Sequence, residues 1–238
     1  MKLDILAFGA HPDDIELSCS GTLISHIKKG YKVGVVDLTK GEMGTRGTPE
    51  IRLQEAAKAA EIMGLSAREN LGFRDGWFQV DEEHQLEIIR MIRKYQPDIV
   101  FANATYDRHP DHGRGAKLVE EAFFKAGLRM IKTSDQGKEQ EAWRPKRLLH
   151  YIQSVSLTPD IYVDISDSQE TKMEAIKAYK TQFYNPDEDG PETYISSKNF
   201  MDMLIARGRE YGQRINVEFA EGFCLPQPYG VRDLNHLI

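Results

Sequence analysis

The chain has few cysteines, no long apolar run and no excess of positive charge, and each absence excludes a class of protein. Cys19 and Cys224 are the only cysteines among 238 residues, so neither a disulfide framework nor a cysteine-rich zinc site is expected. Lysine and arginine number 31 against 37 acids, a net charge of −6, which argues weakly against nucleic acid or a membrane surface as partner. No apolar stretch approaches the roughly 18 residues of a membrane span.

The N-terminal segment MKLDILAFGA is apolar enough to be compared with a secretory signal. Asp4 interrupts it, however, and the acidic sequence HPDD follows where a small-residue cleavage site would stand. Together with the low cysteine content, this predicts a cytoplasmic protein.

Short apolar runs alternate with helical patterns through the first half of the chain. Strands are expected at 3–8, 31–38 and 98–102, with the end of another at 70–73, and helices at 17–29, 50–63, 82–95 and 113–126. The less regular second half predicts strands at 148–154, 161–165 and 216–219, helices at 170–183 and 198–212, and a loop at 185–193. We expect an α/β fold, a Rossmann-like, mostly parallel sheet with helices on both faces, in one domain spanning 1–238.

Two clusters of acids and histidines lie directly between a predicted strand and a predicted helix. They are His11-Pro-Asp-Asp14 and His109-Pro-Asp-His112. In an open parallel sheet, such loops all emerge at the carboxyl ends of the strands, where ligands bind. The two clusters are therefore expected to face each other across one crevice.

Imidazole and carboxylate together suit zinc and other first-row divalent ions. His11 and Asp14 are three residues apart and can point toward one spot, and three protein ligands with one open position are typical of a catalytic zinc. We predict one Zn²⁺ per chain, or another first-row ion, held by His11, Asp14 and His112.

The two remaining side chains beside the predicted ion have the properties that amide hydrolysis requires. Asp13 can take a proton from a water whose pKa the ion lowers to about 7, and can deliver it to a leaving amine. His109 can stabilise the developing oxyanion, and Asp111 can hold His109 in the charged form.

A simpler interpretation treats each cluster as a turn, because proline and aspartate favour turns and aspartate can cap the following helix. A single HPDD sequence would leave the two interpretations about equal. Two clusters at equivalent strand ends favour the site.

Both clusters resemble the motifs of the zinc-dependent de-N-acetylases of the PIG-L/LmbE-like family, AHPDDIE at 10–16 and HPDH at 109–112. Further segments resemble the branch that removes acetyl from N-acetylglucosaminyl-malate in bacillithiol biosynthesis: DLTKGEMGTRGT, RLQEAAKAA, NLGFRDG, EAWRPK, AYKTQFY and VEFAEGF. The resemblance implies the fold, the zinc, the same ligand set, a small N-acetylated amino sugar as substrate and a homo-oligomer, in some members a hexamer.

The resemblance also implies which residues bind the substrate. Arg52 and Asp75 would hold the sugar and its malate, and Arg144 would lie near the acetyl end. The segment GEMGTRG at 41–47 is open to two interpretations, a mobile surface loop or a substrate lid with glycine hinges.

Other functions remain open from the sequence. The enzyme could deacetylate another N-acetylated sugar, such as a chitooligosaccharide. Two histidines and one carboxylate also form the triad of non-haem iron oxygenases, and a non-catalytic metal-binding protein could use the same fold.

Overall fold

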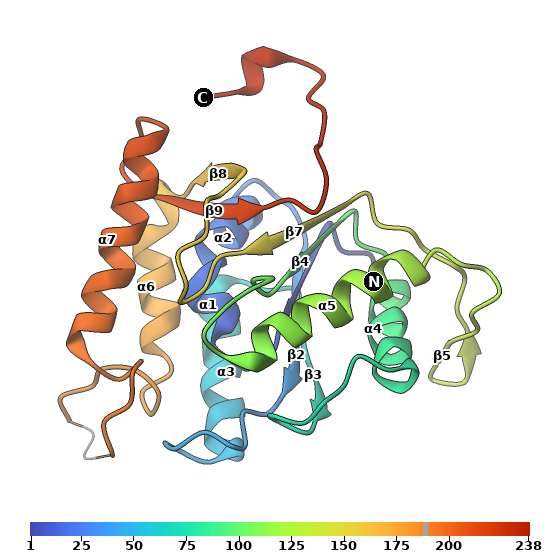
Figure 1. Cartoon of the computed structure of the whole chain (residues 1–238), viewed down its shortest axis with the longest axis horizontal. Coiled ribbons are helices and arrows are strands. Elements are labelled where there is room, and N and C mark those ends of the chain that lie inside the picture. The colour runs from blue at the N-terminus through green and yellow to red at the C-terminus, as the bar shows by residue number, and fades with distance from the viewer. Residues whose placement is uncertain (188–189) are drawn as a thin grey trace.

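A seven-stranded sheet forms the centre of the structure, a computed structural model that describes residues 1–187 and 190–238. The strand order is β3-β2-β1-β4-β7-β9-β8 (Figure 1). The parallel strands are β1 (Ile5–Gly9), β2 (Val33–Thr39), β3 (Ala67–Phe73), β4 (Ile99–Ala102) and β7 (Arg147–Tyr151). β9 (Ala220–Cys224) is antiparallel to both β7 and β8 (Ile161–Asp164).

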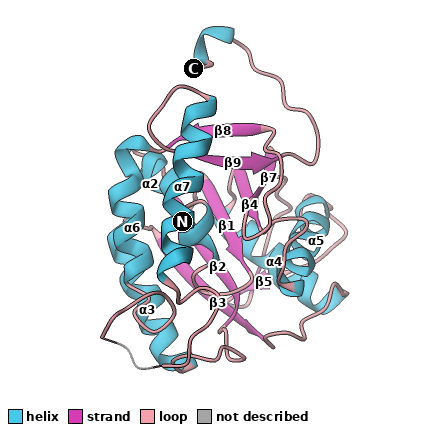
Figure 2. Ribbon diagram, turned by 60° about the vertical axis from the view of Figure 1, so that its left-hand side comes forward, coloured by secondary structure: helices cyan, strands magenta, loops and turns pink. Residues whose placement is uncertain are grey.

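Helices cover both faces of this sheet, so the predicted fold class is confirmed (Figure 2). One face carries α4 (Glu82–Tyr95) and α5 (Pro110–Lys125). The other carries α1 (Asp14–Ser18), α2 (Ser20–Lys28), α3 (Pro49–Met63), α6 (Gln169–Lys177) and α7 (Lys198–Arg214). Two single-turn 3₁₀ helices lie at Ser166–Ser168 and Leu234–His236. Among the described residues, no helix is long and apolar enough to cross a membrane.

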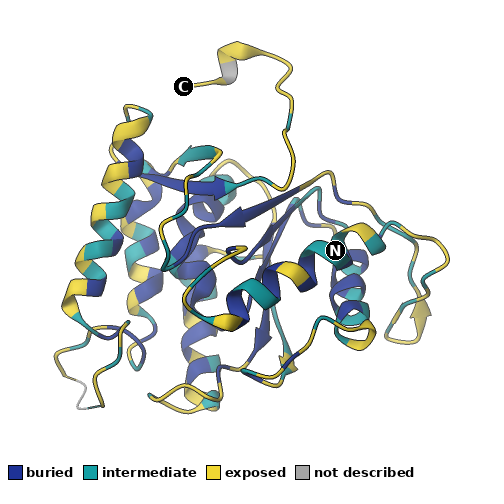
Figure 3. Ribbon diagram, in the orientation of Figure 1, coloured by how far each residue is buried: buried dark blue, intermediate teal, exposed yellow. Residues whose placement is uncertain are grey.

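The sheet divides the hydrophobic core into two layers. Alternate residues of β1 contribute to each layer: Ile5 and Ala7 pack with α2, α3 and α6, whereas Leu6 and Phe8 pack with α4 and α5. Figure 3 shows the central strands β1, β2, β4, β7 and β9 buried along most of their length, while the outer faces of the helices are exposed. A strand with a helix on each face buries both of its faces, and its sequence is therefore a nearly continuous apolar run.

Helix boundaries follow the capping residues. Thr48 accepts a hydrogen bond from the backbone N of Ile51 at 3.3 Å, Pro49 occupies the first turn, and Gly64 ends α3 at φ 76°. In the same way, Asp81 caps α4 through the backbone N of His84.

Several boundaries differ from the prediction. The helix expected at 17–29 is two helices broken at Cys19, and the first begins at Asp14, inside the first motif. α5 likewise begins at Pro110, inside the second motif. The strand expected at 216–219 lies at β9, and a short hairpin of β5 (Ser134–Asp135) and β6 (Lys138–Glu139) was not predicted. The loop expected at 185–193 includes residues 188–189, which lie outside the described residues.

A buried ion-pair network fastens α1 to the sheet beneath the first motif. Arg68 of β3 donates from Nε and Nη2 to the two oxygens of Asp37 on β2, at 2.8 and 2.9 Å. Its Nη1 donates to Glu16 of α1 at 2.5 Å, and Tyr179 OH donates to the same Glu16 oxygen at 3.1 Å. Because both acids are fully buried, the single guanidinium compensates two charges.

Replacing Arg68 with methionine leaves two buried carboxylates without their cation. Removing one partner of a buried ion pair costs about 3–5 kcal/mol, so Arg68→Met should lower the free energy of unfolding by at least that range. Urea denaturation measures this, with Arg129→Met, at an exposed position, as the matched control. A loss below about 1 kcal/mol, the scale of a surface pair, would contradict this account of the network.

Candidate active site

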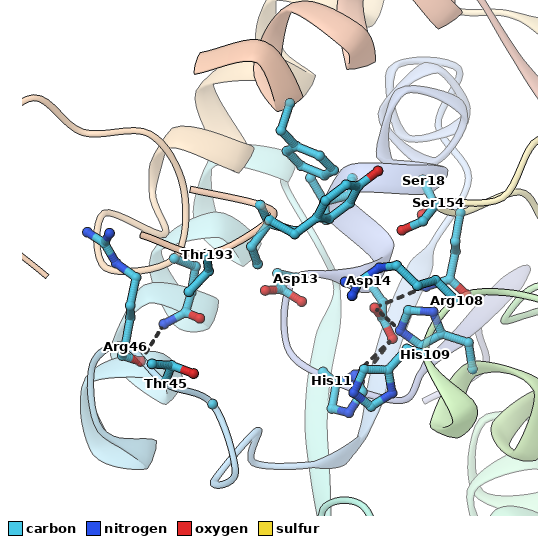
Figure 4. A pocket seen from close by; sticks show the side chains of 18 of the residues that line it. His11, Asp13, Asp14, Ser18, Thr45, Arg46, Arg108, His109, Ser154 and Thr193 are labelled. Atoms are coloured by element: carbon cyan, nitrogen blue, oxygen red, sulfur yellow. Dashed lines mark hydrogen bonds and ion pairs between the residues drawn. The ribbon is translucent and has the colours of Figure 1, made fainter. Parts of the chain in front are cut away.

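A cavity of about 390 Å³ opens at the carboxyl ends of β1 and β4, where both motifs lie. Loop 41–47, segment 193–195 and one side of α7 complete its wall. In Figure 4, Thr45 and Arg46 lie across the cavity from His109 and Arg108, with Asp13 between them. The two motif loops therefore line one cavity, as the sequence predicts.

Asp13 immediately precedes α1 in a backbone conformation that is unusual for a residue with a side chain. Its φ is 121°, in the region that favours glycine, and its carboxylate makes no capping hydrogen bond to α1. Asp14 serves the local turn instead, because its Oδ2 accepts from the backbone N of His11 at 3.0 Å. The turn interpretation thus holds for Asp14 and leaves the carboxylate of Asp13 for the cavity.

His109 caps α5 with its ring. The backbone N of Asp111 donates to Nδ1 of His109 at 3.2 Å, so Nδ1 is an acceptor and the proton of a neutral ring lies on Nε2. Burial lowers the pKa of His109 below its usual value, and the charges of His11 and His112 lower it further. A neutral His109 ring therefore has its hydrogen-bond donor at Nε2.

The contacts of Asp111 differ from those predicted, because its carboxylate makes no hydrogen bond to His109 and its charge only opposes the lowering of the pKa of His109. The carboxylate of Asp111 is fully buried; its Oδ1 accepts from Arg114, and its Oδ2 accepts from the backbone N of Gly76 at 2.8 Å. Nε2 of His11, at 3.5 Å, is the imidazole nitrogen nearest to it. Asp111 therefore fixes the start of α5 and faces His11.

Asp14 lies between the two histidines that were predicted to share an ion with it. Its Oδ1 is 3.1 Å from Nε2 of His112, and its Oδ2 is 3.7 Å from Nδ1 of His11. Ligands around a tetrahedral zinc, at about 2.0 Å from it, are separated by about 3.3 Å. Nitrogen and carboxylate donors at this spacing fit a divalent ion. Ring nitrogens of His11, His109 and His112 also lie within 4.8 Å of one another, so His109 is a further candidate donor.

In His11 and in His112, the ring nitrogen that points away from Asp14 faces a second carboxylate. Nε2 of His11 is 3.0 Å from Asp75, and Nδ1 of His112 is 2.6 Å from Asp107. This arrangement is typical of metal-binding histidines, because the outer carboxylate fixes the tautomer and the direction of the inner nitrogen. Burial lowers the pKa of His112, but the charge of Asp14 and the bonds to Asp107 and Asp14 raise it to about 9.

Two amides that the sequence analysis missed hold the carboxylate of Asp14 from behind. Asn103 Nδ2 donates to Oδ2 at 2.9 Å, and Gln153 Nε2 donates to Oδ1 at 3.1 Å. Each lies one or two residues after a parallel strand, β4 or β7. Polar residues at those strand ends were the signal that could have identified Asn103 and Gln153, together with Asp107 in the second loop.

Arg52 was predicted to bind malate, but its guanidinium is already bound within the chain. Its Nη2 donates to Asp13, its Nε to the carbonyl of Pro12 at 3.2 Å, and its Nη1 to the carbonyl of Gly41 at 3.4 Å. Burial raises the pKa of Asp13 to about 6 although the charge of Arg52 opposes this. Arg52 therefore positions Asp13, and the geometry offers no free fork for a substrate carboxylate.

Asp75, the second predicted substrate residue, is likewise engaged. Its Oδ1 faces His11, and its Oδ2 accepts from the backbone N of Met43 at 2.9 Å. Burial raises the pKa of Asp75, but the bond and the charge of His11 outweigh this and lower it to about 2. Asp75 therefore orients His11 and loop 41–47.

Arg144, the third, does not line the cavity of its own chain. It lies three residues before β7 begins, at the amino ends of the parallel strands, with its guanidinium 4.6 Å from the ring of Phe124. The sequence placed it only by similarity, since it follows no strand.

Loop 41–47 is tied down at both ends. Besides the bond from Met43 to Asp75, Arg46 donates from Nε to the carbonyl of Thr181 at 2.7 Å and from Nη1 to that of Pro191 at 3.2 Å. Gln182 donates to the carbonyl of Arg46 at 2.8 Å. The loop thus closes one side of the cavity in this structure.

The fold and the site together define a class: an α/β protein whose strand ends present the donor set of a divalent-metal centre beside an unligated acid. Residues 6–123 match the family described as PIG-L: GlcNAc-PI de-N-acetylase. A diacetylchitobiose deacetylase from Thermococcus kodakarensis is 33% identical over 193 residues, 75% of this chain and 70% of that protein. The chain belongs to the PIG-L family of de-N-acetylases.

Solved structures agree with this assignment. The conserved protein TT1542 from Thermus thermophilus has a TM-score of 0.86 and 36% identity, and 98% of each chain is covered. N,N'-diacetylchitobiose deacetylase from Pyrococcus horikoshii has a TM-score of 0.80 and 28% identity, with 98% of this chain and 88% of that chain covered.

The particular branch within the family is less closely matched. A probable N-acetyl-alpha-D-glucosaminyl L-malate deacetylase 2 from Bacillus subtilis is 27% identical over 199 residues, 76% of this chain and 84% of that protein. That is a lower identity than to the diacetylchitobiose deacetylase. The comparisons therefore support deacetylation of an N-acetylated sugar without selecting malate.

The donor set predicts a graded loss of metal. His112→Ala removes a ligand and should leave almost no bound zinc, whereas Asp107→Asn weakens the orientation of His112 and should lower zinc affinity by roughly 10–100-fold. Metal analysis and competition with a chelator measure both. His84→Ala, at a half-buried histidine of α4 that does not line the cavity, is the control, and full retention of zinc by His112→Ala would disprove the ligand assignment.

Proposed function

We propose that the protein is a zinc-dependent N-deacetylase that removes the acetyl group from a 2-acetamido sugar, with N-acetylglucosaminyl-malate as its substrate. One observation carries the reaction class: the carboxylate of Asp13 is held by Arg52 at the cavity, next to the His11, Asp14 and His112 donors, without being one of them. Membership of the PIG-L family supports the acetamide as the bond that is cleaved.

When bound, the divalent ion supplies Lewis acidity, which polarises the amide carbonyl and activates water at neutral pH. His11, Asp14 and His112 would hold it, because their inner atoms face one another and their outer atoms are bound to Asp75 and Asp107.

Asp13 acts first as general base and then as general acid. Its carboxylate takes the proton from the attacking water as the oxygen bonds to the acetyl carbon, and returns that proton to the nitrogen as the C–N bond breaks. A carboxyl whose pKa burial raises to about 6 is suited to both transfers. The neutral His109 donates from Nε2 to the oxygen on which negative charge develops.

This arrangement argues against the other classes that remained open. A non-haem iron oxygenase or a non-catalytic metal-binding protein has no use for an acid fixed beside the donors by its own arginine. A chitooligosaccharide remains the competing substrate, and the higher identity to a diacetylchitobiose deacetylase favours it. Acetate release from N-acetylglucosaminyl-malate and from N,N'-diacetylchitobiose, before and after chelation and zinc repletion, tests the proposal. Absence of zinc-dependent release from both would overturn it.

The role of Asp13 predicts a loss of turnover without a loss of metal. Asp13→Asn keeps the volume and a hydrogen bond to Arg52 but cannot accept the proton of water, so kcat should fall by roughly 10²-fold or more. Steady-state assays with parallel zinc analysis measure this. If kcat stays within a few-fold of the parent, another residue is the base.

The contacts of Arg52 predict an effect that does not depend on the substrate. Arg52→Ala leaves Asp13 buried without its cation and free to turn, so catalytic efficiency should fall on malate-bearing and neutral substrates alike, with their ratio changed by less than about twofold. Arg52→Lys is the matched variant, because it keeps the charge and loses the fork. A selective loss on the malate-bearing substrate would return Arg52 to the malate site.

A further inference from the structure

Arg207 is a cation that faces the cavity without a carboxylate partner. It lies in the middle of α7 and lines the cavity beside Gln153 and Ser154. Its Nη1 donates to the backbone carbonyl of Gln153, and its Nε and Nη2 are accessible atoms with no hydrogen bond within the described part of the chain. Arg207 also lines a second, smaller pocket beside Lys172 and Glu221. Among the residues that the structure describes, no acid lies within 4.0 Å of it.

The cations that are more deeply buried than the half-buried Arg207 are all compensated. Arg52, Arg68 and Lys172 each pair with a buried carboxylate. Arg93 has no such acid but donates to three backbone carbonyls and to the hydroxyl of Thr133. Against this background, Arg207 has one acceptor for five N–H groups.

The two remaining arginines of the cavity wall, Arg46 and Arg108, differ from Arg207 in their surroundings. Arg46 donates to three backbone carbonyls, and its Nη2 is sealed from the cavity, so a ligand cannot reach it. Arg108 is exposed to solvent, with its guanidinium 4.4 Å from the ring of Tyr194. Arg108 is therefore largely hydrated, whereas Arg207 is half-buried in the cavity wall.

The acids nearest to Arg207 are committed elsewhere. Glu221 accepts from Lys172 at 2.6 Å and from the backbone N of Gly21 and Thr22, and Asp107 accepts from His112 and from the backbone N of Val155. Burial accordingly lowers the pKa of Arg207, and these distant charges do not reverse it. A cation in this environment is stabilised by an anion that comes with a ligand.

Gln153 places Arg207 on the same wall as the proposed reaction centre. The side chain of Gln153 holds the carboxylate of Asp14, and its backbone carbonyl accepts from Arg207. The apolar side chains of Leu17 and Leu204 line the same cavity as Arg207 and Asp13. A sugar whose acetamide lies at Asp13 therefore has its other substituents in a cavity to which Arg207 also contributes.

We propose that Arg207 is the residue that binds a carboxylate on the substituent of the sugar, so that the protein prefers an anionic sugar conjugate to a neutral one. This inference rests on the proposed deacetylation and assigns its substrate class. A guanidinium whose Nε and Nη2 are both without a partner suits a carboxylate, because these two atoms can donate two parallel hydrogen bonds. Arg207 thereby takes the role that Arg52 cannot perform while it holds Asp13.

The test compares efficiencies on an anionic and a neutral substrate. We expect Arg207→Gln to lower the ratio of kcat/KM on N-acetylglucosaminyl-malate to that on N,N'-diacetylchitobiose by about 10–100-fold, mainly through KM on the malate conjugate. Arg207→Lys should fall between the parent and Arg207→Gln. Arg209→Gln, two residues further along α7 at an exposed position, should leave the ratio unchanged.

Zinc content and thermal stability are measured for each variant, because Arg207 touches the backbone of Gln153. An unchanged ratio in a folded, zinc-loaded Arg207→Gln protein overturns the proposal. If that variant does not fold, an unchanged ratio in Arg207→Lys has the same meaning. A selective loss in Arg108→Gln but not in Arg207→Gln would place the anion at the mouth of the cavity instead.

Calorimetric titration separates this inference from the proposed function and from product binding. Binding of L-malate by the zinc-loaded parent should weaken about 10-fold or more in Arg207→Gln, and this holds even if neither substrate is hydrolysed. Binding of acetate should not change. If only acetate binding weakens, Arg207 holds the released acetate and the substituent site is disproved.

Discussion

The carboxylate of Asp14 is the point at which three separate loops of the protein meet. It accepts from the backbone N of His11 after β1, from Asn103 after β4 and from Gln153 after β7, and it faces His112 at the start of α5. These contacts are possible because β1, β4 and β7 are neighbours in a parallel sheet, so their carboxyl ends lie side by side. The position of every donor in the site depends on this shared acceptor.

Strain and buried charge at the first motif are offset by the surrounding structure. Asp13 has a φ of 121°, a conformation that costs of order 1–3 kcal/mol for a residue with a side chain. It is retained because Arg52 binds its carboxylate and the carbonyl of Pro12, and because Glu16 fastens α1 to Arg68 on the sheet. The strained residue is the one that projects an unligated acid into the cavity.

Much of the cavity wall is built by segments other than the two motifs. Loop 41–47, segment 193–195 and α7 contribute that wall, and none of them contains either motif. The identity to diacetylchitobiose deacetylases therefore speaks for the reaction more directly than for the substituent of the sugar. A single uncompensated arginine on α7 distinguishes a charged substituent from a neutral one on physical grounds.

Much of the fold and of the reaction centre could be predicted from the sequence. Apolar runs separated by helical patterns predict parallel strands with helices on both faces, and residue types at 11–14 and 109–112 predict the cluster of histidines and carboxylates at the strand ends. These signals are local, because a strand, its loop and the following helix are contiguous in the chain. The errors were at boundaries, where Cys19 breaks a helix and β9 begins four residues later than expected.

Only the tertiary structure decided which charged groups remain free. Arg52, Asp75 and Asp111 are plausible substrate or catalytic residues by type and position, yet each is bound within the chain to Asp13, His11 or Arg114. Arg207, with no motif around it, is left without an anion. The partners of Arg52 and Asp75 lie 39 and 64 residues away in the chain, and no local pattern records such pairings.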